Sequence, residues 1–589
     1  MRLMNHDELM MALLARGYFP KELPPPFSSA SFAKRLDEIK PGWDACENDA
    51  AAKKRHLYPR VSKSARFDMA RKGHSRRMLS VPNPVNQYYL VKEICDNYPD
   101  IIEKLSQSKI SITRSDICFD GKRAVTIPTL SSLSERRIKA YSTAKAILQT
   151  DILSFYHSIY THSIPWALHG KDEAKARRTF SPQYYGNKVD AMMRSCQDGQ
   201  TMGIPVGPDT SRLVSEFILC AIEKNIDRKL VDKIIGGYRY IDDFFLCFSS
   251  YTDAEVFLTA LRDSVSDFDL QLNASKTYIS DALNFNEESW PGEIPQLKLS
   301  GSRDNQRQNI IRFFTEVIRL SKSLPDESIA SFAIRKTSRC LIHRENWELY
   351  ESFILRLARE NSNCTDSVVK IICTYAACGY PVSERVKAFA EGMLEEHAPR
   401  NHHYEVVWIL WLCCSMSIKL GDRASKIAAK VPNSLCACLV YMLRGQHLLT
   451  GRHSISGWVG TMDEKALSGE HWMVVYESGT RSGWRLSGSK ELVIADPHFS
   501  VLRDRKVNFF DTKATNVALD LPSIDELLKS SLGSRRTALL PGRIRFDSTK
   551  PRSKRRYEAL GADYGDDEWD RTSSIHDDAI GFHDFEDIL

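Results

Sequence analysis

The sequence predicts an α+β fold over residues 1–300, an all-α helical-repeat region over 301–453 and a small strand-rich element over 454–545. Before residue 300, short apolar runs rich in aromatic and β-branched residues alternate with helical patterns. After it, apolar residues recur at three- and four-residue spacing, and then the composition shifts to Trp, Gly and β-formers. A chain of 589 residues also exceeds the usual size of one hydrophobic core, so two or more domains are expected.

Two adjacent aspartates interrupt an apolar, aromatic stretch of the first region. Asp242 and Asp243 lie between residues 234–235 and 244–248, and this pattern is typical of a hairpin whose turn carries the Asp pair. Like charges so close oppose each other's ionisation unless a cation lies between them. An ordinary polar turn is the alternative interpretation, because Asp is a common turn residue. Taken alone, the pair favours that alternative.

A third carboxylate follows a separate apolar strand. Asp151 ends the run 146–151. Two strands that present Asp151 and the Asp242/Asp243 pair at a common edge would hold two Mg²⁺ ions, or Mn²⁺ in their place, through oxygen ligands. Such ions stabilise the attacking and leaving oxygens of an in-line phosphoryl displacement. The three carboxylates therefore predict a two-metal site for phosphoryl transfer.

Two further segments fit the same chemistry. The Gly/Pro-rich loop 203–211 precedes an amphipathic helix predicted over 212–222, and its glycines permit close approach of the backbone to a base pair. Residues 268–277 read as a short strand with Lys276 at its end, where an ammonium could meet a triphosphate. A plain surface lysine is the competing interpretation for Lys276.

In this order the segments resemble the palm of a reverse transcriptase, with residues 146–156, 203–211, 240–243 and 272–276 in the places of motifs A, B, C and D. Residues 76–87 and 122–124 match the two fingers motifs. The resemblance is closest to the bacterial unknown-group and abortive-infection reverse transcriptases, a defence-associated lineage, and is carried by residues 17–25, 155–169 and 203–211. It implies a right-hand polymerase with fingers and palm over 1–300, a helical-repeat domain in place of the thumb over 301–453, a small mixed element over 454–545 and a basic-then-acidic flexible tail over 546–589.

The resemblance also implies roles for individual residues. Asp151, Asp242 and Asp243 would be catalytic and would hold the metal ions together with the backbone carbonyl of Ile152. Tyr156 lies where this fold crowds a ribose 2′-hydroxyl, so dNTPs should be preferred over rNTPs. The remaining candidates are Arg77, Arg123, Gly207 and Lys276 for nucleotide binding and Tyr240 for positioning the primer.

The implied function is RNA-directed DNA synthesis from dNTPs on a noncoding RNA template, in antiphage defence. One alternative is template-independent or protein-primed synthesis by the same site, with Tyr557 and Tyr564 as candidate primers. Val206 favours it, because most reverse transcriptases have Gln there, a side chain that helps to seat the template and primer. A further alternative is a non-catalytic scaffold or binding protein. An intron or retron enzyme is disfavoured by the missing maturase-like or zinc-containing nuclease segment and by the helical extension.

Composition agrees with a cytoplasmic nucleic-acid enzyme. The formal charge of +6 hides a basic stretch, residues 53–77, that is interleaved with His56, Tyr58 and Phe67 and suits phosphate contact, and an acidic end, residues 557–589. The 14 cysteines form no C-x-x-C pair, which favours reduced thiols in the cytosol. The amino terminus lacks the core of a signal peptide, and the most apolar run, residues 406–416, is too short to span a bilayer. We expect no membrane contact, and self-association, if any, through the helical region.

Overall fold

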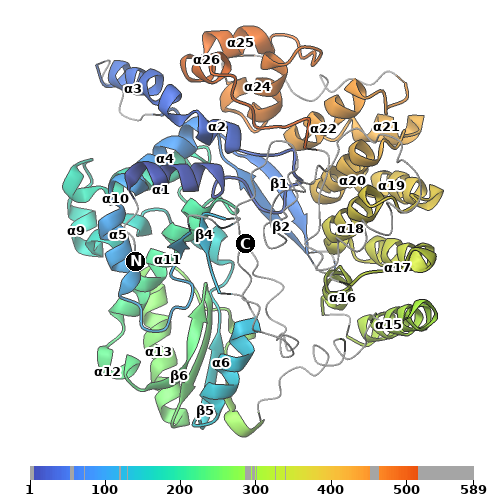
Figure 1. Ribbon diagram of the computed structural model, residues 1–589. Helices are drawn as coiled ribbons and strands as arrows, with labels where there is room; N and C mark the ends of the chain where they lie inside the picture. Colours follow the sequence, from blue (N-terminus) through green and yellow to red (C-terminus); the bar gives the residue numbers. More distant parts are fainter. Residues whose placement is uncertain are drawn as a thin grey trace, which may run out of the picture.

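The computed structural model describes residues 5–52, 59–71, 73, 75–118, 121, 123–128, 131–284, 294, 299, 302–324, 327–338, 340–451, 463 and 465–514. This part of the chain is mostly helical, with one four-stranded sheet and two two-stranded sheets (Figure 1). The predicted mixture of an α+β region followed by a helical region is therefore observed.

The four-stranded sheet has the order β6-β7-β5-β8, and all neighbouring strands are antiparallel. Its central strands β5 and β7 are apolar and buried along almost their whole length, which explains their runs of β-branched and aromatic residues. Helix α13 packs against β5 and β7, and α11 packs against α13. The elements of this part are β5 (Ala146–Thr150), α7 (Phe155–Ser158), α8 (Ser163–His169), α9 (Lys171–Ala176), α10 (Gly186–Ser195), α11 (Asp209–Asn225), α12 (Arg228–Val231), β6 (Ile234–Tyr240), β7 (Asp243–Phe248), α13 (Tyr251–Asp267) and β8 (Tyr278–Asp281).

The amino-terminal part combines helices with a β-hairpin. In that hairpin β1 pairs antiparallel with β2, from Ala65 opposite Val81 to Ala70 opposite Arg76. Helix α1 packs on α4, and α4 in turn packs on α10. The elements are α1 (His6–Ala15), α2 (Ala30–Lys34), α3 (Leu36–Ala52), β1 (Ala65–Ala70), β2 (Arg76–Val81), α4 (Pro84–Asp96), α5 (Tyr98–Ser106), β3 (Asp116–Ile117), β4 (Val125–Thr126) and α6 (Ser131–Tyr141).

The helical region confirms the sequence pattern. All five helices expected from three- and four-residue spacing, at 309–320, 347–358, 367–377, 386–396 and 404–418, are present. Helices of this region pack on one another, α17 on α18, α18 on α20, α19 on α20 and α20 on α22. The elements are α15 (Arg303–Ser323), α16 (Ile329–Thr337), α17 (Trp347–Glu360), α18 (Thr365–Ala377), α19 (Glu384–His397), α20 (His403–Met416), α21 (Asp422–Ala428) and α22 (Ser434–Gly445).

The strand-rich element expected after residue 454 is wrong for the described residues 463–514. This segment folds into α24 (Trp472–Thr480), α25 (Ser489–Ala495) and α26 (Pro497–Asp504). Residues 472–476 are each 0% exposed, so this run of β-formers is buried on every side. A continuous apolar run of this kind shows neither helical nor strand periodicity, which is why the pattern misled. Residues 457–460 of the same prediction and the tail 546–589 lie outside the described part.

The described carboxyl-terminal helices pack against the amino-terminal part. Phe27 forms an isolated bridge with Phe510, and their rings meet edge to face at 5.1 Å. The Trp472 indole donates a hydrogen bond to the Val81 carbonyl at 3.3 Å, and that of Trp43 donates to the His498 carbonyl at 3.2 Å. The described residues of 5–96 and of 465–510 therefore share one core, at the top of the molecule in Figure 1.

Within the described ranges, no helix combines the length and the apolar character that crossing a membrane requires. All 14 cysteines are free thiols, and most of them are buried.

Candidate active site

The three aspartates lie at one edge of the four-stranded sheet. Asp151 directly follows β5, Asp243 is the first residue of β7, and Asp242 lies in the turn between β6 and β7. Tyr240 pairs with Asp243 across this hairpin, while Thr150 at the end of β5 pairs with Phe244. The end of β5 and the turn therefore meet, which confirms both the predicted hairpin and the predicted common edge.

The turn holds a backbone conformation that its sequence does not favour. Ile241 has a φ of +55°, a region that β-branched residues seldom occupy. Its N–H donates to Thr113 Oγ1 at 2.9 Å, and its carbonyl accepts from Arg239 Nη1 at 2.8 Å. Two partners from outside the turn thus keep the Asp pair in place.

Asp151 has one carboxylate oxygen engaged and one unpaired. Its Oδ2 lies 3.1 Å from Lys276 Nζ. Its Oδ1 is buried and has no hydrogen-bond partner among the described residues. An unpaired buried carboxylate oxygen is costly, and coordination of a cation would remove that cost. The oxygen ligands gathered at this edge are those that Mg²⁺ prefers, so the residues present fit the predicted ions.

The backbone around Ile152 suits the carbonyl ligand expected there. The Asn273 N–H donates to the Asp151 carbonyl, and the Leu153 N–H donates to the Gln271 carbonyl, both at 2.9 Å. Backbone groups of successive strand residues point to opposite sides. The carbonyl of Ile152 therefore points toward the β7 side, where the Asp pair lies. Ile152 itself is 1% exposed.

Lys276 belongs to a 3₁₀ turn rather than to the strand expected over 268–277. The turn spans Ala274–Lys276, and β8 begins only at Tyr278. Leu272 does pair with Ile152, but as an isolated bridge. The lysine side chain is 39% exposed and reaches Asp151, so the structure brings Lys276 to the predicted site.

The loop 203–211 is tied to the amino-terminal part of the chain. The Val206 carbonyl accepts from the Ser80 N–H at 2.8 Å. Arg123 donates to the Asp209 carboxylate, to the Gly207 carbonyl at 3.0 Å and to the Phe19 carbonyl. These contacts hold the Arg123 side chain against the loop 203–211. Its predicted nucleotide contact and that of Gly207 remain predictions.

Gly207→Ala is expected to destabilise the protein by about 1–3 kcal/mol, the usual range for a strained backbone conformation. Gly207 has a φ of +123°, and an added Cβ would lie 2.7 Å from Pro20 Cγ. Urea unfolding measures the loss. As a control, Gly445→Ala should stay within about 0.5 kcal/mol of wild type, since a Cβ there meets nothing within 4 Å. Equal effects of the two substitutions would contradict this reading of the loop.

Tyr156 is held from the side of α11. It is 8% exposed, and Ser215 Oγ donates to its hydroxyl at 3.2 Å. Burial raises the pKa of Tyr156. The nearby charge of Arg212 lowers this pKa by a smaller amount, and the charge of Asp242 raises it. The side chain therefore lies close to both α11 and the Asp pair.

Arg76 and Arg77 are adjacent in β2 and point to opposite faces of the β1–β2 hairpin. Arg76 binds Glu405 of α20, at 3.0 Å and 2.5 Å for its two donors. Burial lowers the pKa of His157, and the nearby charge of Arg77 lowers it further, so Arg77 lies on the side of α7. Alternation along a strand explains this division.

Tyr240, the predicted primer-positioning residue, is 5% exposed and its hydroxyl lies 3.5 Å from the Pro128 carbonyl.

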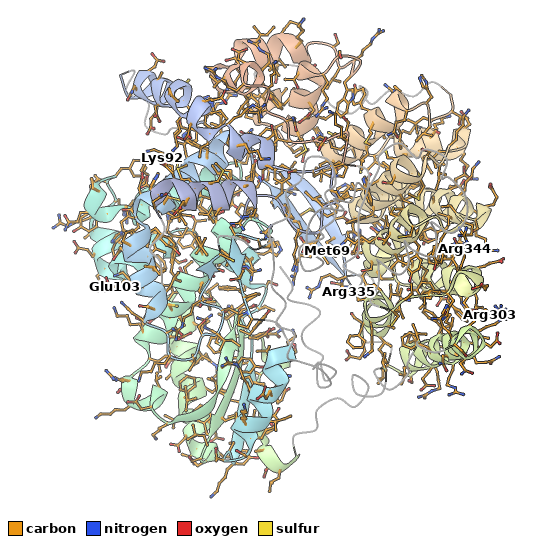
Figure 2. The ribbon with its side chains drawn as sticks, in the orientation of Figure 1. Met69, Lys92, Glu103, Arg303, Arg335 and Arg344 are labelled. Atoms are coloured by element: carbon orange, nitrogen blue, oxygen red, sulfur yellow. The ribbon has the colours of Figure 1, made fainter. Side chains whose placement is uncertain are left out.

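Cations from separate elements converge near the loop. The pKa of Lys21 is lowered to about 8, mainly because neighbouring protein atoms displace water from its ammonium; Glu22 opposes this effect, and the charges of Arg212, Arg123 and Arg335 add to it. Lys21 as a whole residue keeps solvent-exposed surface. Arg335 comes from α16, on the side of the helical region that faces the β1–β2 hairpin in Figure 2, whereas Arg303 and Arg344 lie on its outer side. This concentration of positive charge favours an anionic ligand.

A buried network behind the turn was missed by the sequence analysis. Arg239 is 0% exposed and donates to Glu216 at 2.8 and 3.1 Å and to Glu223. Burial opposes its charge, but the two glutamates outweigh that effect, and the pKa of Arg239 is raised. An arginine inside an apolar strand, and two glutamates seven residues apart in an apolar helix, were the available signals.

Other predicted residues lie elsewhere or outside the described part. Phe67 of the basic stretch is 0% exposed and packs on Tyr404 at 6.1 Å, so it is a core residue and not a surface for bases. His56 and Tyr58 lie outside the described ranges, as do the candidate primers Tyr557 and Tyr564.

No protein-family model matches the chain, and a search of curated proteins finds no significant match. Among solved structures, telomerase from Candida tropicalis in complex with a fragment of telomeric RNA is similar, with 12% identity over 56% of this chain and 67% of that chain and a TM-score of 0.26. At so low a TM-score, the function has to be argued from the residues of this chain.

Proposed function

We propose that this chain is a DNA polymerase of the reverse-transcriptase type, with a fingers-and-palm arrangement over residues 1–300, which transfers nucleotides from dNTPs to a primer hydroxyl. The observation that carries the proposal is the meeting of Asp151, Asp242 and Asp243 at one sheet edge, with Asp151 Oδ1 buried and unpaired. An ordinary polar turn would account for the Asp pair alone. It would not account for a third, half-unpaired carboxylate from another strand.

Asp151, Asp242, Asp243 and the carbonyl of Ile152 are the groups that would hold two Mg²⁺ ions. Bound there, the ions supply charge stabilisation for the attacking hydroxyl and the departing pyrophosphate. The chain's own residues position this chemistry: Thr113 and Arg239 hold the turn, and Ser215 holds Tyr156. The cations around Lys21 would neutralise phosphates of the template and primer.

Lys276 would change partners during the reaction. Its ammonium now neutralises Asp151 at 3.1 Å. Cations bound by the carboxylates would compete with that contact and free Lys276 to bind the triphosphate or to donate a proton to the leaving pyrophosphate. Its partly exposed side chain, 39%, gives it the freedom to move.

The direct test is incorporation of labelled dNTP by the purified full-length chain with Mg²⁺ or Mn²⁺. Products are divided into samples treated with protease before phenol extraction and samples extracted directly, and into samples with and without prior RNase. Sequencing the product then identifies the template. Incorporation that requires a divalent ion supports the proposal, whereas no incorporation with RNA, DNA or endogenous nucleic acid as template would overturn it.

Template-independent or protein-primed synthesis is the second candidate, and the buried Val206 favours it. Val206 is 3% exposed, and its carbonyl is engaged by Ser80. The apolar side chain cannot offer a template base the hydrogen bonds that Gln would. In the same assay this mode predicts a product that resists prior RNase and, if a tyrosine such as Tyr557 or Tyr564 is the primer, stays with protein until protease is added.

Tyr156→Ala is expected to relax the choice between dNTPs and rNTPs. The ring would crowd a 2′-hydroxyl, so its removal should lower the dNTP-over-rNTP ratio of kcat/KM by about 10–100-fold, the discrimination that one steric contact provides. Tyr156→Phe is the matched control, since it keeps the ring and loses only the bond to Ser215. If Phe and Ala variants behave alike, Tyr156 does not act through its ring.

We further propose a noncoding RNA as template and a role in antiphage defence, both resting on the lineage that motifs A to D and residues 17–25 resemble. Sequencing of RNA that copurifies with the chain tests the first. The efficiency of phage plating on cells that express the chain tests the second, with the Asp242→Asn variant as control. Equal protection by wild type and variant would separate defence from polymerisation and favour the scaffold alternative.

A further inference from the structure

Three metal-ligating side chains meet away from the palm, where the helical region packs on the β1–β2 hairpin. His397 ends α19, His402 immediately precedes α20, and Glu405 lies in the first turn of α20. The Nδ1 atoms of the two histidines are 2.9 Å apart, and His397 Nδ1 lies 3.7 Å from Glu405 Oε1. One ligand atom from each residue lies within 4.8 Å of the other two.

The cluster is largely removed from solvent. The side chains of His397 and Glu405 are 8% and 0% exposed, and His402 is half-buried. His397 Nε2 is buried with no partner among the described residues. Polar side chains this costly to bury call for a role beyond packing.

The spacing matches a coordination shell. Two ligand atoms each about 2.1 Å from a tetrahedral Zn²⁺ ion lie about 3.4 Å apart. The observed separations of 2.9 and 3.7 Å bracket that value. Two imidazole nitrogens and one carboxylate oxygen form a donor set that suits Zn²⁺ and other late transition metals and not Mg²⁺ or Ca²⁺. We propose that His397 Nδ1, His402 Nδ1 and Glu405 Oε1 bind one Zn²⁺ ion.

The residues around Glu405 orient its carboxylate. Arg76 of β2 donates to both of its oxygens. The guanidinium is a positive charge beside the proposed cation, and Asp68 of β1 offsets it at 2.5 Å from Arg76 Nε. The His403 N–H in turn donates to Asp68. Outer partners of this kind hold metal ligands in the required direction.

The ion would have a structural role. It would fasten the junction of α19 and α20 which, through Glu405 and Arg76, is joined to the hairpin that carries Arg77 on its other face. The helical region and the fingers would then move as one body. This site shares no residue with the carboxylate edge of the sheet, so the inference stands independently of the proposed polymerase.

Metal content of the untagged, full-length protein tests the site. After dialysis against metal-free buffer, elemental analysis should find about one Zn²⁺ per chain, and Co²⁺ exchanged into the site should give the visible absorption of tetrahedral coordination. His397→Ala and His402→Ala should each lose the ion. His6→Ala, at an exposed histidine paired with Asp96, should keep it. Asp151→Asn should keep it too, which separates this site from the palm.

Heating provides a second readout. A strong chelator should lower the Tm of wild type and leave the Tm of His402→Ala unchanged, because an ion that binds only the folded state stabilises it. If the histidine variants do not fold, the Co²⁺ spectrum and the chelator shift of wild type still decide the matter. The proposal fails if wild type neither holds nor takes up Zn²⁺, or if both histidine variants retain it.

Discussion

Asp242→Asn is expected to abolish DNA synthesis, with a loss in kcat of about 10³-fold or more, because it removes a metal-holding charge from the point where charge develops. Asp151→Asn should do the same from the other strand. Neither substitution changes side-chain size, and both remove repulsion between like charges at the sheet edge. We therefore expect the Tm of Asp242→Asn to equal or exceed that of wild type, as is common when a strained functional site is neutralised. Asp151→Asn also loses the ion pair with Lys276, so its Tm should gain less.

Asp232→Asn is the matched control for these variants. Asp232 is exposed and lies just before β6, at the opposite end of the same hairpin, where it pairs with Lys109 at 2.7 Å. Its substitution should leave kcat and KM unchanged. Labelled dNTP incorporation and thermal unfolding would be measured on the same preparations. Incorporation of dNTP by a purified variant in which both Asp242 and Asp243 are replaced would contradict the polymerase assignment.

Arg239→Met is expected to have the largest effect on stability, a loss of about 3–5 kcal/mol. The substitution leaves Glu216 and Glu223 buried without their cation, and it removes the hydrogen bond to the Ile241 carbonyl. The free energy of unfolding of Arg239→Lys should lie between those of wild type and Arg239→Met, since one ammonium cannot bind both glutamates and the turn together. Urea unfolding gives the order wild type, Lys, Met.

The same network should matter for catalysis beyond its effect on folding. Arg239 joins α11 to the turn that carries Asp242, so the folded fraction of Arg239→Lys should show a reduced kcat with little change in the KM for dNTP. Arg481→Met is the control. Arg481 pairs with the fully buried Glu477 in the carboxyl-terminal helices, far along the chain from the palm. It should be destabilised in a similar way and keep the kcat of its folded fraction.

Rescue distinguishes a positioning role from a purely structural one. Adding Glu216→Gln and Glu223→Gln to Arg239→Met removes the unpaired buried charges and should recover much of the stability. It does not restore the bond to Ile241, so kcat should stay low. Recovery of both quantities together would mean that Arg239 acts only by neutralising the glutamates.

Local signals explain why much of the candidate site could be predicted. Each of two features is contained within about a dozen residues: a strand followed at once by Asp151, and a hairpin with Asp242 in its turn. Strand periodicity allows both to be recognised in the sequence. The helices after residue 300 follow the same logic. The run 472–476 shows the limit, since residues buried on every side carry no period; its Trp472 packs against Val81 and Phe509, which lie outside any short window around the run.

The amino-acid sequence alone was sufficient to predict that Asp151 and the Asp242/Asp243 pair meet at one edge of the sheet, because Asp residues next to apolar strands are recognisable within short segments. Long-range packing decided the rest. Arg239 meets Glu216 only when β6 lies on α11, and Arg76 meets Glu405 only when residues 329 positions apart come together. Burial sets the energy of such pairs, and burial is a property of the whole fold that no short window of residues contains.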